Sequence, residues 1–86
     1  MKTKTIYVGY RATPTTCFGV TRLTLKRPLE KDEAEEKAIK GLFSQADFEE
    51  NLQEVFDNLL RVKQIYYAYF VRKKDARKWS ERYAYR

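Results

Sequence analysis

The sequence predicts an α+β domain in which a three-stranded antiparallel sheet carries two or three helices, in the order β-β-α-α-β-α. Three observations predict this fold. Apolar residues alternate with others near the N-terminus and again over residues 64–73, as in half-buried strands. Between these stretches, apolar residues recur every three or four positions, as in helices. The length of 86 residues fits one compact unit, so we expect a single small basic domain over residues 1–86.

The first 28 residues are predicted to form a β-hairpin. Thr3–Arg11 is rich in β-branched and aromatic residues, and Pro14 lies in a threonine-rich turn. Cys17–Lys26 supplies the second strand. We expect Pro28 to end it, because proline has no N–H to donate to a sheet.

The second strand has two apolar phases. Phe18 and Val20 share one face, whereas Leu23 and Leu25 share the other. Either both faces of the strand are covered, or a bulge near Thr21–Arg22 shifts the register. The pattern leaves both alternatives open.

The middle of the chain predicts two helices, and we expect all helices of the fold to lie on one face of the sheet. Leu29–Phe43 has apolar residues at helical spacing, with Asp32 as its expected N-cap. Ser44–Asp47 resembles a capping box, and the most periodic segment of the chain follows it. This predicts a helix over roughly residues 45–62.

The C-terminal part predicts a strand and a short helix. Residues 64–73 are dense in β-forming side chains, although a helical continuation stays open. This third strand is expected to return beside one strand of the hairpin. Asp75 is the expected N-cap of a helix over Ala76–Tyr85.

Charge is distributed in three blocks. The chain has a net charge of +6, with +6 in residues 1–28, −7 in residues 29–57 and +7 in residues 58–86. If the two basic ends pack together, the fold has one positive and one negative face. The alternative is that the blocks only offset one another within the fold.

Residues 64–86 combine aromatic and basic side chains more densely than any other part of the chain, with five tyrosines and the single tryptophan among seven lysines and arginines. Aromatic rings stack on unpaired bases, and cations contact phosphates. We therefore expect a non-enzymatic protein that binds RNA or single-stranded nucleic acid. The expected contact residues are Tyr7, Arg11, Tyr66, Tyr67, Tyr69, Arg72, Lys73, Lys74, Arg77 and Lys78, and the patch could be widened by Arg22, Lys26 and Arg27. Strand alternation means that about half of the rings serve the core instead.

The alternative hypothesis is a small protein-binding inhibitor or adaptor, of the kind that phages and mobile elements encode against a host enzyme or a ribonucleoprotein defence complex. Its expected anchors are Trp79, Tyr83 and Tyr85, because tryptophan and tyrosine dominate protein interfaces. The acidic segment Glu30–Asp57 could dock a basic partner or a second copy. A homodimer would compensate for the small core of such a short chain.

Two short stretches resemble the RNA-recognition motif. Ile6–Gly9 resembles the core of that family's first strand motif, and Tyr67–Tyr69 resembles part of its second motif. Tyr66 stands where the family has glycine, and a second strand rather than a helix follows the first. No residue roles are therefore carried over from that family.

Catalysis is not expected. The chain has no histidine, which removes the usual general base and most zinc sites, and we expect no cofactor and no metal. One enzymatic alternative stays open. Toxin ribonucleases of the RelE type cut RNA without a histidine pair, and the chain is similar to them in size, basicity and its end Arg82–Arg86. A single cysteine, with no apolar run long enough to span a bilayer, predicts a cytoplasmic protein without a membrane partner.

Overall fold

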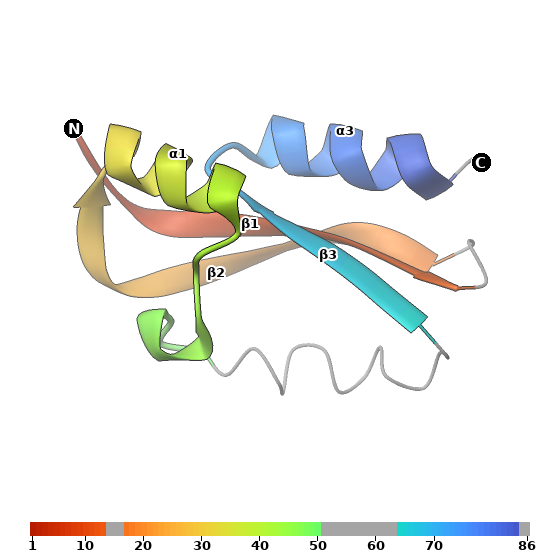
Figure 1. Cartoon of the computed structure of the whole chain (residues 1–86), viewed down its shortest axis with the longest axis horizontal. Coiled ribbons are helices and arrows are strands. Elements are labelled where there is room, and N and C mark those ends of the chain that lie inside the picture. Colours follow the sequence, from red (N-terminus) through yellow and green to blue (C-terminus); the bar gives the residue numbers. More distant parts are fainter. Residues whose placement is uncertain (14–16, 51–63, 85–86) are drawn as a thin grey trace.

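The chain folds into the predicted α+β arrangement around a three-stranded antiparallel sheet of order β2-β1-β3 (Figure 1). The computed structural model describes residues 1–13, 17–50 and 64–84. Its elements are β1 (Lys2–Thr13), β2 (Cys17–Glu30), α1 (Lys31–Lys40), the short 3₁₀ helix η1 (Gln45–Asp47), β3 (Gln64–Phe70) and α3 (Lys73–Ala84). The predicted hairpin is confirmed, and the third strand returns beside β1 as expected.

The two apolar phases of β2 arise because both faces of the sheet are covered. The pairing with β1 runs without interruption from Thr24 to Cys17, so no bulge lies at Thr21–Arg22. Leu23 is fully buried on one face, and Val20 is half-buried on the other. The first of the two alternatives is therefore correct.

The second strand was expected to end at Pro28. Instead it continues to Glu30. The register shifts instead between Thr3 and Thr5, where residues 25–28 of β2 stand opposite Lys4 alone. Pro28 lies within this wide bulge on an edge strand. No paired N–H is required of it there, so the proline is tolerated.

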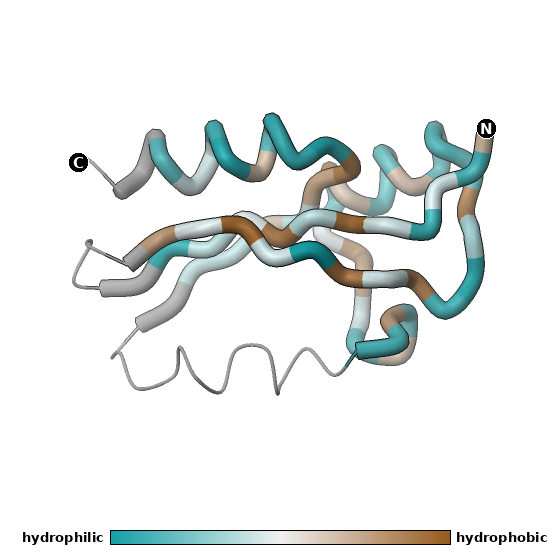
Figure 2. Tube along the Cα trace, turned by 180° about the vertical axis from the view of Figure 1, so that it is seen from behind, coloured by the Kyte–Doolittle hydropathy of each residue, from teal (hydrophilic) through white to brown (hydrophobic). Residues whose placement is uncertain are grey.

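The main core lies on the face of the sheet that carries Ile6 and Val8. Phe43, Phe48 and Tyr69 form an aromatic cluster there, with ring centres 5.7–6.0 Å apart. Among the described residues, the buried cluster comprises Ile6, Val8, Leu23, Leu25, Leu29, Ala34, Ala38, Phe43, Phe48 and Tyr69. In Figure 2 the apolar segments lie mainly on the strands, whereas most of α3 is hydrophilic.

The opposite face of the sheet packs against α3. A Cβ atom on Gly9 would lie 2.7 Å from the carbonyl oxygen of Ala76 and 3.2 Å from Cε3 of Trp79, so the helix backbone approaches the strand closely. Ala76 and Ser80 are buried at this contact, and the Ser80 hydroxyl donates to the Arg77 carbonyl oxygen at 2.9 Å. Helices thus cover both faces, which corrects the expectation that they share one.

The helix starts also differ from expectation. Glu30 rather than Asp32 is the N-cap of α1, because Glu30 still pairs with Lys2 and the Lys31 N–H donates to the Met1 carbonyl oxygen. The chain therefore passes from strand to helix without a side-chain cap. Asp75 likewise lies inside the first turn of α3 rather than at its N-cap. At these positions the carboxylates still favour the positive end of each helix dipole.

The segment after α1 is only partly helical. Ser44 and Asp47 interact as expected, since Oδ2 of Asp47 accepts from the Ser44 N–H at 2.9 Å and from its hydroxyl at 3.0 Å. The helix expected from residue 45 is wrong at its start, because Phe48 is extended and bridges to Leu25 of β2. The rest of this expected helix, from residue 51 to residue 62, lies outside the described residues. In the described ranges, no helix is long and apolar enough to cross a membrane.

Candidate nucleic-acid interface

The two basic parts of the chain meet in the fold. β3 pairs with β1, and α3 packs across β1 and β2. In Figures 1 and 2 the acidic helix α1 and the basic helix α3 follow one another along the top of the view, although they pack on opposite faces of the twisted sheet. Arg72 and Glu35 face each other where the two helices meet, with Nη2 and Oε1 3.9 Å apart. The described structure therefore gathers basic residues at α3, whereas the α1 end is mixed in charge, because Lys37 of α1 lines a pocket together with Lys26 and Arg27 of β2.

Arg11 joins β1, β3 and α3 through two aromatic rings. Its guanidinium carbon lies 5.2 Å from the ring centre of Tyr66 and 5.0 Å from that of Trp79, which are cation–π distances. Trp79 also contacts Phe70, with ring centres 6.2 Å apart. Tyr66 is 47% exposed, so part of its ring faces solvent while Arg11 lies against it. Arg11, Tyr66 and Trp79 are called the arginine–aromatic cluster below.

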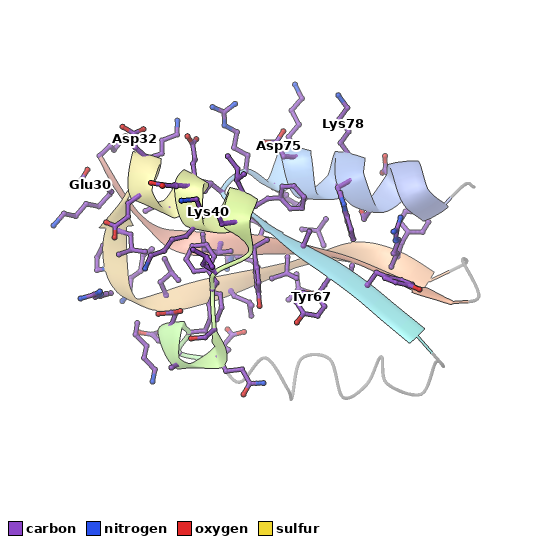
Figure 3. All side chains as sticks on the ribbon, viewed as in Figure 1. Glu30, Asp32, Lys40, Tyr67, Asp75 and Lys78 are labelled. Carbon is purple, nitrogen blue, oxygen red and sulfur yellow. The ribbon has the colours of Figure 1, made fainter. Side chains whose placement is uncertain are left out.

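The three tyrosines of β3 do not form one surface. Tyr66 lies on the α3 face, whereas Tyr67 is 51% exposed on the opposite face. Tyr69 is only 8% exposed, because it packs in the aromatic core. Its inclusion among the expected contact residues is corrected, since a buried ring offers no stacking surface to a base. In Figure 3, Tyr67 and Lys78 point to opposite sides of the molecule.

Burial raises the pKa of Tyr69 to about 12, with smaller contributions from the nearby Tyr67 and Asp47. A raised pKa means that the fold favours the neutral phenol. This stabilisation is therefore complete below the unfolded pKa of about 10 and is lost as pH rises through about 12. We expect an absorbance titration at 295 nm to show one tyrosine that ionises late. Tyr69→Phe should remove that component, and an unchanged titration curve would contradict the assignment.

The cations of α3 divide into paired and unpaired groups. Arg77 lies 3.9 Å from Glu81, Nε to Oε1, one turn along the helix. Among the described residues, Lys73, Lys74 and Lys78 take part in no ion pair. Lys74 and Lys78 lie one turn apart on the side of the helix away from the sheet, and Figure 3 shows Lys78 pointing outward.

The remaining expected site residues are Tyr7 and the three expected protein-interface anchors. Tyr7 is half-buried on the α3 face beside Phe70, its partner in the β1–β3 register. Trp79, expected as a protein-interface anchor, is half-buried in the arginine–aromatic cluster. The other two anchors, Tyr83 and Tyr85, have side chains outside the described residues. The structure thus unites Arg11, Tyr66 and Trp79 and separates them from Tyr67 and Tyr69.

An apolar groove between α1 and β3 was not found from the sequence. Ile39 lines this groove and is 86% exposed, although it is one of the apolar residues at helical spacing in Leu29–Phe43. The groove has a volume of about 380 Å³ and is lined by Glu35, Ala38, Ile39, Ala68, Tyr69, Phe70, Val71, Arg72 and Asp75. Finding this groove from the sequence would have required knowing that only Ala34 and Ala38 of α1 are buried.

Comparisons with known proteins add no family. No protein-family model, curated protein or solved structure matches the chain significantly. Within the part of the chain that the structure describes, no three side chains of histidine, cysteine, aspartate or glutamate come together as a metal ion would require. What the site offers to a ligand is the aromatic rings of the arginine–aromatic cluster and the cations of α3.

Proposed function

We propose that the protein is a cytoplasmic, non-enzymatic nucleic-acid-binding protein whose ligand is RNA or single-stranded nucleic acid. The observation that carries this proposal is the half-exposed ring of Tyr66, backed by Arg11, on a domain whose helix α3 presents unpaired lysines. An unpaired base stacks on the open part of the Tyr66 ring. Lys74 and Lys78 attract the phosphates along the outer side of α3.

Single strands are favoured because stacking needs an accessible base face. In a duplex the faces of neighbouring bases cover one another, and a protein reaches only their edges and the backbone. The Tyr66 ring lies on a three-stranded sheet, whereas the major groove of a DNA duplex admits a helix or a two-stranded ribbon. The arginine–aromatic cluster therefore suits an unpaired base better than a base pair.

We expect Lys74→Gln with Lys78→Gln to weaken binding of a labelled single-stranded RNA and to flatten its salt dependence. Each lost phosphate contact should reduce the slope of log affinity against log salt by about 0.7. Fluorescence anisotropy at several salt concentrations measures both quantities. The matched control is Lys31→Gln with Lys40→Gln on α1, which removes the same amount of charge at a distance from α3. Equal effects of the two pairs would mean that only net charge matters.

We expect Tyr66→Ala to weaken binding of the same RNA by about 1–3 kcal/mol, because the substitution removes a stacking surface. Tyr66→Phe keeps the ring and should bind nearly as well as the original chain. A thermal melt checks that loss of the Arg11 contact does not unfold the variant. Failure of the unmodified protein to bind RNA or DNA at low salt would overturn the proposal, and cleavage of the RNA would favour the ribonuclease alternative.

A second candidate function is protein binding at the α1–β3 groove. It is favoured by the exposed Ile39 in a largely apolar groove whose lining carries the carboxylates of Glu35 and Asp75 and only one cation, Arg72, among the described residues. Such a site suits a partner segment in which an apolar side chain stands next to a basic one. Affinity capture from host extract should recover one protein that Ile39→Asp loses and that the Lys74/Lys78 variant retains. A protein held equally by both variants does not use the groove.

A further inference from the structure

We propose that a second cationic site, formed where the bulge of β2 meets α1 and η1, binds a phosphate group. This bulge pocket has a volume of about 260 Å³ and is lined by Leu25, Lys26, Arg27, Leu29, Lys37, Ala46 and Asp47. It shares no lining residue with the arginine–aromatic cluster or with α3. The sequence suggested that Lys26 and Arg27 extend the aromatic patch, whereas the fold gives them a pocket of their own.

The bulge explains why two successive cations line one pocket. Side chains of neighbouring residues in a regular strand point to opposite faces. Here residues 25–28 stand opposite Lys4 alone, so the alternation is interrupted and Lys26 and Arg27 both reach the same hollow. Lys37 approaches from α1 and is itself half-buried. Three cations from two elements therefore converge on one concave surface.

Close carboxylates do not neutralise these cations. Among the described residues, no carboxylate oxygen lies within 4 Å of the charged nitrogen atoms of Lys26, Arg27 or Lys37. Among the described residues of the lining Asp47 is the one acid, and its Oδ2 already accepts two hydrogen bonds from Ser44. The backbone hydrogen bond from Ser44 lowers the pKa of Asp47, and the charges of Lys37 and Arg27 lower it further. The pocket therefore holds two positive charges in excess.

This excess fits a phosphate group. A guanidinium and two ammonium groups donate charge-assisted hydrogen bonds to phosphate oxygens, and arginine can do so with two parallel bonds. Leu25 and Leu29 form the apolar part of the lining, and of the three cations Lys37 is the one that is partly withdrawn from solvent. The pocket is larger than one phosphate, so it admits a phosphodiester as well as a free phosphate. The shared chemistry is the tetrahedral oxyanion.

The test records backbone amide spectra of the intact chain during three separate titrations, with inorganic phosphate, with a dinucleotide that has one phosphodiester, and with sodium chloride at matched ionic strength. We expect saturable shifts at the amides of residues 25–27 and 46–47 with phosphate or the dinucleotide, but not with chloride. Lys37→Gln and Arg27→Gln should each weaken binding about tenfold. Asp47→Asn should strengthen it, because it removes a negative charge from the lining.

The outcomes separate the possible sources and the two proposals. Saturation by the dinucleotide identifies a nucleic-acid backbone phosphate, whereas saturation by phosphate alone identifies a free phosphate or a monoester. Lys74→Gln with Lys78→Gln should leave the shifts at residues 25–27 and 46–47 unchanged in either titration. If RNA binding at α3 fails while phosphate still saturates the pocket, the proposed function is lost and the pocket stands. Identical shifts with chloride, or unchanged affinity in the Lys37 and Arg27 variants, would overturn the pocket.

Discussion

Replacing Gly9 with alanine is expected to lower the free energy of unfolding by about 1–3 kcal/mol, the usual cost of overpacking a close contact. The added Cβ would lie 2.7 Å from the carbonyl oxygen of Ala76, which is a backbone atom of α3 and cannot rotate away. The whole helix must therefore shift from the sheet. Urea unfolding followed by Trp79 fluorescence measures the loss, and the same signal should move to longer wavelength in the folded variant, because Trp79 becomes more exposed.

Gly19→Ala is the matched control. Its added Cβ would come equally close to a neighbour, 2.6 Å from the hydroxyl oxygen of Tyr10. That atom belongs to a side chain rather than to a helix backbone, so a shift of one ring relieves the contact, and we expect a smaller loss than at Gly9. An alanine also reduces the freedom of the unfolded chain by about 0.4–1 kcal/mol, which favours folding. Equal losses at Gly9 and Gly19 would show that the contact with α3 is not special.

The contact at Gly9 also shows which part of the fold the sequence could predict. Alternation correctly predicted all three strands, because a strand exposes its two faces at every second residue. It did not predict that α3 lies on the face opposite the main core. That arrangement depends on two small residues, Gly9 and Ala76, meeting across elements that are far apart in the chain. Small residues carry no hydrophobic signal, so their pairing is not visible in a periodicity.

The candidate site was predicted in part for the same reason. Alternation required that neighbouring tyrosines of β3 face opposite sides, but both phases are aromatic, so their burial could not be assigned. Contact with Phe43 and Phe48 decides it by burying Tyr69, whereas α3 leaves Tyr66 half-exposed. The bulge pocket was missed because Lys37 lies in the acidic part of the chain. Its charge joins those of β2 only after the bulge has formed.

Phe48→Ala is expected to lower the free energy of unfolding by about 3–5 kcal/mol, the usual cost of removing a buried phenylalanine. Phe48 is 2% exposed and contacts the rings of both Phe43 and Tyr69. Its backbone also bridges to Leu25, which holds the segment after α1 against β2. Because small domains have total stabilities of about 5–15 kcal/mol, this one substitution should remove a large share. Chemical unfolding followed by circular dichroism measures the change.

The control for Phe48 is Ile39→Ala, which also removes a large apolar side chain but from a position that is 86% exposed. We expect it to change stability by less than about 0.5 kcal/mol, as surface substitutions usually do. Loss of the Phe48 ring should also hydrate Tyr69, so that its pKa falls from about 12 towards the ordinary value in any variant that remains folded. A small loss of stability together with an unchanged Tyr69 pKa would mean that Phe48 is not part of the core. The same pair separates folding from recognition, because Ile39→Ala should weaken a partner of the groove without weakening the fold that presents it.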